Sequence, residues 1–211
     1  MPSIEQAKTW YDPHDPVHGF DHVLRVYHMV EVIGAQLDAD LEILCAAALL
    51  HDASGAAPGE GGTRSSHEQD SAEFARRVLQ AEDWEEGKIA AVLHCIRTHR
   101  YRNQEEPESL EAKILFDADK LDVLGAFGVA RTIGYALQAQ QPIFAQPSAR
   151  FIDQGEKVAD EPHSAYHEYL FKLRHVKDRL FTQPAKLLAE NRNRVMTLFF
   201  EQLAAEAIGE R

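Results

Sequence analysis

The sequence predicts an all-α protein, because amphipathic helical patterns follow one another along nearly the whole chain. No segment shows a convincing alternation of apolar and polar residues, the pattern of a half-exposed β-strand. No internal repeat or low-complexity tract interrupts the helical patterns. With 211 residues and 45% hydrophobic content, the chain can bury one full core, so we expect a single multi-helix domain over residues 1–211.

Each expected helix has its own signal in the sequence. In "FDHVLRVYHMVEVIGAQL" (20–37), apolar residues recur at steps of three and four. "LEILCAAALLHDA" (41–53) is apolar almost all round, which predicts a helix surrounded by others. "SSHEQDSAEFARRVLQ" (65–80) opens with Ser65 or Ser66 as a candidate N-cap of a capping box. Further helices are expected at about 86–100, 110–140, 164–181 and 183–208, the last with Thr182 and Pro184 at its start and Gly209 at its end.

Two long stretches lack a helical pattern. Residues 53–65 are rich in glycine, alanine, serine and proline, and residues 141–163 combine prolines with mixed charges. Irregular loops of this length within a compact domain are usually functional or mobile. We expect them to flank or cover a pocket.

Charge and composition exclude several classes of protein. A formal charge of −12, from 34 acidic residues against 22 Lys and Arg, would repel a nucleic-acid polymer. The chain lacks the long apolar run of a membrane span and the basic-then-apolar start of a secretion signal. Cys45 and Cys95 lie in apolar helical patterns and are expected to be buried free thiols. We therefore expect a cytoplasmic protein that does not contact a membrane.

Polar residues at core-facing helix positions are the candidates for a functional site. His51 and Asp52 end the most apolar helix, although such a pair alone more often marks an ordinary helix end. His22 lies beside the apolar stripe of its helix and points inward, whereas His28 is expected to face out. Asp119 lies inside another strongly apolar helical segment.

Buried carboxylates are costly unless they are paired or bind a metal. Together, His22, His51, Asp52 and Asp119 offer two imidazoles and two carboxylates. This mixed nitrogen and oxygen set suits a divalent ion and leaves coordination positions open for water and substrate. The sequence therefore predicts a metal site built from three helices.

The order His, His-Asp, Asp resembles the HD-domain phosphohydrolase superfamily, and the similarity extends beyond these residues. It is carried by the runs "HGFDHVLRVYHMV", "AAALLHDA", "SSHEQDSAEFARRVL", "IRTHR" and "AKILFDADKLDVLGAFGVAR", and covers about residues 10–205. These runs look like the small bacterial HD hydrolases that include manganese-dependent nucleotide pyrophosphohydrolases. The resemblance implies an all-helical domain with a metal-binding core at about 18–135 and C-terminal helices packed on it.

The resemblance also implies hydrolysis of a phosphate ester or anhydride at one divalent ion held by His22, His51, Asp52 and Asp119. Manganese is the expected ion, with magnesium, cobalt, nickel, iron and zinc as alternatives. Such an ion neutralises charge on the phosphoryl group, so an acidic protein needs no large basic patch. Asp52 is the expected catalytic residue that orients the attacking water, although metal ligation alone fits the spacing equally well.

Two further histidines are candidates for substrate contacts. His67 and His99 lie toward the apolar faces of their helices, whereas His94 falls off the stripe and is expected to be structural or exposed. His67 and His99 could bind phosphate oxygens or serve as hydrogen-bonded core histidines. A second ion would need more inward-facing ligands than these, so we expect a mononuclear site.

Charged residues near the ligands are also substrate candidates. Arg25 lies one turn after His22 and could reach a phosphate or form a surface salt bridge. Lys120 and Asp122 flank Asp119 and could touch the substrate or pair with each other. Glu68 and Glu60 could carry a proton, or be solvated charges.

One departure from the family bears on the substrate. Some nucleotidases of the superfamily carry a glutamate three residues after the His-Asp aspartate, where this chain has Gly55. Pyrophosphate is a stabilised leaving group, so cleavage of a nucleoside triphosphate to monophosphate and pyrophosphate is the favoured reaction.

Three other functions stay open. One is a phosphomonoesterase or phosphodiesterase acting on another small phosphorylated metabolite. Another is a non-catalytic sensor of a nucleotide or phosphometabolite. The third is a helical scaffold whose segment "LLAENRNRVMTLFFEQLAAEA" forms a homodimer contact.

Overall fold

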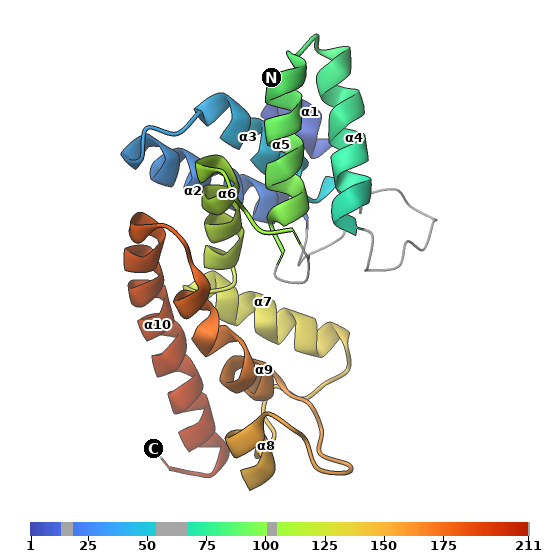
Figure 1. Cartoon of the computed structure of the whole chain (residues 1–211). Helices are drawn as coiled ribbons and strands as arrows, with labels where there is room; N and C mark the ends of the chain where they lie inside the picture. Colours follow the sequence, from blue (N-terminus) through green and yellow to red (C-terminus); the bar gives the residue numbers. More distant parts are fainter. Residues whose placement is uncertain (14–18, 54–66, 101–104, 211) are drawn as a thin grey trace. The chain divides into compact units, whose positions relative to one another are not determined.

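The computed structural model describes residues 1–13, 19–53, 67–100 and 105–210, and every regular element in these ranges is a helix (Figure 1). The predicted all-α class is confirmed. Contacts divide the chain into two compact units, Met1–Asp119 with Phe181–Ala185 and Lys120–Leu180 with Lys186–Arg211. A single domain over residues 1–211 stays a prediction. Among the described helices, none has the length and apolar character needed to cross a membrane.

The core of the first unit is built around α3 (Leu41–Leu50), the most apolar helix. Asp40 caps its N-terminus by accepting hydrogen bonds from two backbone N–H groups. Every residue from Leu44 to Ala53 is buried, as predicted for a helix enclosed by others. The helices that pack against α3 are α1 (Ile4–Lys8), α2 (Phe20–Gln36), α4 (His67–Ala81) and α5 (Glu86–Thr98). Cys45 on α3 and Cys95 on α5 are buried and free, as expected.

Helix α1 is too short to show a helical repeat in the sequence, and the structure adds it to the predicted elements. Ser3 caps it, and Ala7 and Tyr11 pack with Val23 and Leu49 in a buried apolar cluster. The Tyr11 hydroxyl donates to the backbone carbonyl of Leu49 at 2.8 Å. The N-terminal segment thereby packs against α2 and α3, which carry the predicted metal ligands.

The expected helix over 110–140 is wrong, because the structure has two helices there. Helix α6 (Leu110–Leu121) ends before a short turn, and α7 (Gly125–Gln138) begins after it. Gly125 has a φ of +71° and Leu124 is extended, so the α-helix cannot run through this point. The backbone at Leu124 and Gly125 therefore separates α6 from α7.

The remaining helices of the second unit also correct the expected boundaries. Residues 141–163 contain a short helix, α8 (Ala149–Gln154), and the expected helix 164–181 is α9 (Ala165–Phe171) followed by the 3-10 helix η2 (Leu173–Arg179). The expected final helix is confirmed as α10 (Gln183–Ala207). It packs on α9 through stacked rings of Tyr169 and Phe200, whose centroids are 4.5 Å apart.

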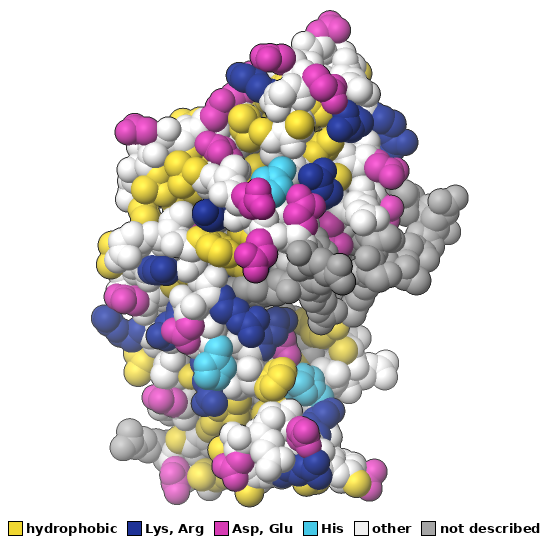
Figure 2. All heavy atoms as spheres, viewed as in Figure 1, with side chains coloured by type: hydrophobic (Ala, Val, Ile, Leu, Met, Phe, Trp, Pro, Cys, Tyr) yellow, Lys and Arg dark blue, Asp and Glu magenta, His cyan; other side chains and the backbone are white. Residues whose placement is uncertain are grey.

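Charged side chains are distributed over the surface. On the face shown in Figure 2, Lys and Arg are interspersed with Asp and Glu, and no continuous basic stripe runs across the described residues. This pattern agrees with the acidic composition.

Candidate metal centre

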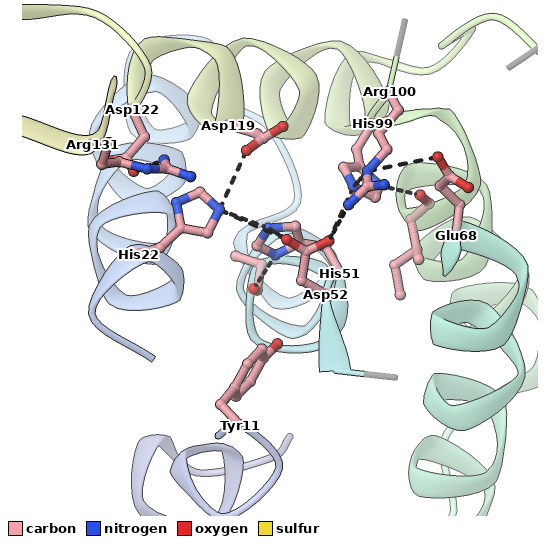
Figure 3. A network of polar contacts seen from close by, with 12 residues as sticks. Tyr11, His22, His51, Asp52, Glu68, His99, Arg100, Asp119, Asp122 and Arg131 are labelled. Carbon is pink, nitrogen blue, oxygen red and sulfur yellow. Dashed lines mark hydrogen bonds and ion pairs between the residues drawn. The ribbon is translucent and has the colours of Figure 1, made fainter. Parts of the chain in front are cut away.

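Two histidines from neighbouring helices face each other in the first unit. His22 lies in the first turn of α2, and His51 caps the C-terminus of α3. Both are buried, and their Nε2 atoms are 3.4 Å apart (Figure 3). The packing of α2 on α3 therefore fixes the separation of the two rings.

A backbone carbonyl sets the tautomer of His51. Its Nδ1 donates to the carbonyl of Ala48 at 2.8 Å, which leaves the Nε2 lone pair directed at His22. Burial lowers the pKa of His51 to about 4, although Asp52 acts in the opposite direction. A neutral imidazole with an oriented lone pair is the form that binds a metal.

Two carboxylates complete the group of four. Asp119, on α6, places Oδ1 3.4 Å from His22 Nε2. Ligand atoms of His22, His51 and Asp119 all lie within 4.8 Å of one another. Asp52 directs Oδ2 toward the same two histidines, 3.6 Å from His51 Nε2 and 3.9 Å from His22 Nε2. The structure thus brings together all four residues that the sequence singled out.

The other oxygen of Asp52 has different neighbours. Asp52 Oδ1 lies 3.4 Å from His99 Nε2 and 3.3 Å from a terminal nitrogen of Arg100. His99 caps α5, is buried, and its Nδ1 donates to the carbonyl of Ile96. Arg100 Nε is 3.6 Å from Glu68 Oε1 on α4 (Figure 3). One carboxylate therefore links the histidine pair to a second polar group.

The other sequence candidates have different outcomes. The side chain of His67 and the whole of Gly55 and Glu60 lie outside the described residues. Arg25 is half-buried on α2, one turn after His22. Lys120 and Asp122 belong to the second unit, where Asp122 pairs with Arg131.

The expectations for His28 and His94 are confirmed. His28 is exposed, as expected. His94 has a structural role, since its Nδ1 lies 2.8 Å from Glu105 and its Nε2 accepts from the N–H of Glu108.

Arg100 is the main residue of this group that the sequence analysis missed. Its only signal is its place in "IRTHR", directly after an inward-facing histidine at a helix end. For Glu68 the sequence offers a proton carrier or a solvated charge, and the pattern gives no sign that Glu68 lies beside Arg100.

Comparisons with known proteins agree with this geometry. The sequence profile of the HD domain family matches residues 19–124, about half of the chain, a range that includes all four residues of the group. YpgQ of Bacillus subtilis (strain 168) is 31% identical over 218 residues, covering 99% of this chain and 96% of YpgQ.

Solved structures show the same relationship. The crystal structure of Bacillus subtilis YpgQ in complex with ADP superposes with a TM-score of 0.74 and 27% identity, covering 99% of this chain and 100% of the other. An HD-superfamily hydrolase from Bacillus thuringiensis gives a TM-score of 0.70 and 28% identity, covering 98% and 97%. The chain therefore belongs to the HD domain family and is a metal-dependent phosphohydrolase of the HD superfamily.

Proposed function

We propose that this protein hydrolyses nucleotides, with cleavage of a nucleoside triphosphate to monophosphate and pyrophosphate as its preferred reaction. The proposal assigns one divalent ion, manganese by preference, to His22, His51, Asp52 and Asp119. The observation that carries it is the convergence of two buried imidazole nitrogens and two carboxylates, with a guanidinium beside them.

The donor set fits a divalent ion. The Nε2 atoms of His22 and His51 face each other inside the protein, and Asp119 and Asp52 direct oxygens at the same point. A cation between them would bind the two carboxylates and the Nε2 lone pair that His51 directs at this point. Two nitrogens with two oxygens favour a transition metal over calcium or magnesium, which prefer all-oxygen sites, and the choice of manganese follows from the family resemblance.

The residues divide the chemistry between them. A divalent ion bound at this site supplies Lewis acidity, which acidifies water and offsets negative charge on the phosphoryl oxygens. Asp52 has Oδ2 toward the histidines and Oδ1 toward His99 and Arg100, so it can bind the ion with one oxygen and orient the attacking water with the other. His99 lies where it can contact a phosphate oxygen, and the proposal gives His67, Arg25, Lys120 and Asp122 lesser roles in substrate binding.

A nucleotide is the substrate class that the comparisons favour. YpgQ, which matches the chain over nearly its whole length, has been crystallised with ADP. The absence of a glutamate at position 55 favours a leaving group that needs little protonation, such as pyrophosphate. Both observations support cleavage of a phosphoanhydride over cleavage of a simple phosphomonoester.

The test is a panel of nucleotides incubated with metal-free protein plus Mn, Mg, Co, Ni or Zn, with phosphate and pyrophosphate measured separately. The proposal expects pyrophosphate as the first inorganic product and nucleoside monophosphates as poor substrates. Orthophosphate as the only initial inorganic product would indicate phosphatase chemistry. Nucleotide binding without turnover under every metal would indicate a sensor.

A further inference from the structure

We propose that Arg100 binds a phosphate group of the substrate and that Glu68 positions its guanidinium for this task. The inference deepens the proposed function and rests on it for the kind of ligand, a small phosphate-containing anion. Neither Arg100 nor Glu68 belongs to the proposed metal ligands.

Contacts with three segments set the position of Arg100. It follows His99, the residue that caps α5, and its Nε lies 3.3 Å from His99 Nε2. On one side a terminal nitrogen lies 3.3 Å from Asp52 Oδ1, and on the other Nε lies 3.6 Å from Glu68 Oε1 on α4 (Figure 3). The guanidinium therefore lies between two carboxylates, one just after the end of α3 and one on α4.

These contacts leave the guanidinium available for a ligand. Charge-assisted hydrogen bonds of this type are normally about 2.7–2.9 Å long, so both contacts are loose. The Arg100 side chain is 31% exposed, whereas the side chains of Asp52 and Glu68 are each 8% exposed. Arginine carries five N–H donors in a planar fork that matches two phosphate oxygens. The cation is thus on the more accessible side of its two buried partners.

The negative charge around Arg100 explains why binding of an anion needs a positively charged side chain here. Asp52, Asp119 and Glu68 place three carboxylates around the group, and the whole chain is strongly acidic. An anionic substrate would be repelled by these carboxylates. A divalent ion together with one guanidinium offsets the three carboxylate charges, and a phosphate can then approach.

Removing the charge of Glu68 distinguishes two roles of this residue, because they predict opposite changes in the affinity for an anion. If Glu68 were only a nearby negative charge, its removal would strengthen binding of an anion. If it positions Arg100, its removal frees a long side chain to turn toward solvent, and binding of the anion weakens. The two roles predict opposite changes.

The experiment measures binding of inorganic pyrophosphate to the manganese-loaded protein by calorimetry, with bound manganese counted by elemental analysis. R100Q should weaken binding about 10-fold or more, and R100K less, because lysine keeps the charge and loses the fork. E68Q should weaken it roughly 3-fold, and R100Q/E68Q should bind no more weakly than R100Q alone. All variants should keep their manganese.

A matched ion pair near the same end of α5 serves as control. Arg97 on α5 pairs with Glu105 at 2.9 Å, and R97Q and E105Q make the same charge changes as R100Q and E68Q. Both controls should bind pyrophosphate as the parent does.

Three results would overturn the proposal: unchanged affinity in R100Q, tighter binding in E68Q, or loss of manganese in both R100Q and R100K, which would mean that Arg100 acts through the metal ligands. Because pyrophosphate binding needs no turnover, a parent protein that hydrolyses no nucleotide but loses pyrophosphate affinity in R100Q keeps this inference and refutes the proposed reaction.

Discussion

Two aspartates of α6, two residues apart, have opposite surroundings. Asp117 is fully buried and accepts hydrogen bonds from the backbone N–H of Phe181 at 2.8 Å and of Thr182 at 2.7 Å, and from the Thr182 hydroxyl at 2.6 Å. Asp119 instead directs Oδ1 at His22. One carboxylate holds a chain segment in place, and the other faces the histidines of the proposed metal site.

The first prediction concerns Asp119. The variant Asp119→Ala should lose the bound ion and all metal-dependent hydrolysis, because a carboxylate ligand is removed, while the helical fold persists. Elemental analysis and circular dichroism on the same sample measure both properties. Full metal occupancy and turnover in this variant would refute the ligand assignment.

Asp117 provides the second prediction. Asp117→Asn should lower the free energy of unfolding by about 2 kcal/mol, since the amide presents donors to groups that themselves donate. It should still carry the ion. Denaturant unfolding checks the stability, and a variant as stable as the parent would contradict the anchoring role.

The carboxylate of Glu161, in the second unit, makes the stability of the folded protein depend on pH. Glu161 accepts hydrogen bonds from the backbone N–H groups of Ser148 and Val158 and from the Ser148 hydroxyl, and it lies 3.1 Å from His167. These bonds, led by the Ser148 N–H, lower the pKa of Glu161 from 4.5 to about 2. The stabilisation is therefore complete above about pH 4.5 and is lost as the pH falls toward 2.

The third prediction follows from this loss of stabilisation at low pH. Glu161→Gln should lower the melting temperature by roughly 5 °C at pH 7, and the difference from the parent should shrink between pH 4.5 and 2. Melting curves of both proteins across this range test it. A difference that stays constant with pH would show that the Glu161 charge does not contribute.

The sequence predicted single residues well where the signal was local. His22, His51 and Asp119 were found because a polar residue on an apolar helical face is visible in one chain segment. The role of Asp117 was not visible, because its partner Thr182 lies 65 residues away. Arg100 was missed for the same reason, since Asp52 and Glu68 meet it only after three segments have folded together.

At the scale of elements, helix existence was predicted better than helix boundaries. Residues 110–140 are apolar enough to read as one helix, and the break at Gly125 depends on a backbone conformation that composition does not reveal. The 3-10 helix η2 was likewise read as part of an α-helix, because both types bury residues three apart. Hydrophobic periodicity shows which residues are buried. It does not show a break between two helices when the residues before and after the break are buried to a similar extent.

The fourth prediction compares two glycines of α7. A Cβ on Gly128 would lie 2.2 Å from the Val123 carbonyl oxygen and 2.6 Å from Met196, whereas a Cβ on Gly134 would meet no atom within 4 Å. Gly128→Ala should therefore lower the free energy of unfolding by at least about 2 kcal/mol. Gly134→Ala should raise it by about 0.5–1 kcal/mol, because alanine favours the helix. Equal effects in denaturant unfolding would contradict the close approach at Gly128.

At the scale of the whole molecule, the question is whether the two units unfold together. The chain enters the second unit at Lys120, returns to the first unit for Phe181–Ala185, and re-enters the second unit at Lys186. Two helices, α6 and α10, have residues in both units. Most of a helix's stability in a protein comes from its packing, so loss of one unit would fray the helices that continue into the other. We therefore expect one cooperative transition, in agreement with the single domain that the sequence predicts.

The fifth prediction uses the ion to test this cooperativity. The proposed ligands all lie in the first unit, and an ion that binds only the folded protein stabilises it by about 2.7 kcal/mol at a concentration 100 times its Kd. If unfolding is cooperative, the slowest-exchanging amides of α3 in the first unit and of the Lys186–Ala207 part of α10 in the second should both slow about 100-fold on adding manganese. Hydrogen exchange followed by mass spectrometry measures both segments in one sample, and Asp119→Ala should show no slowing in either. Slowing confined to α3 would instead show that the second unit opens on its own.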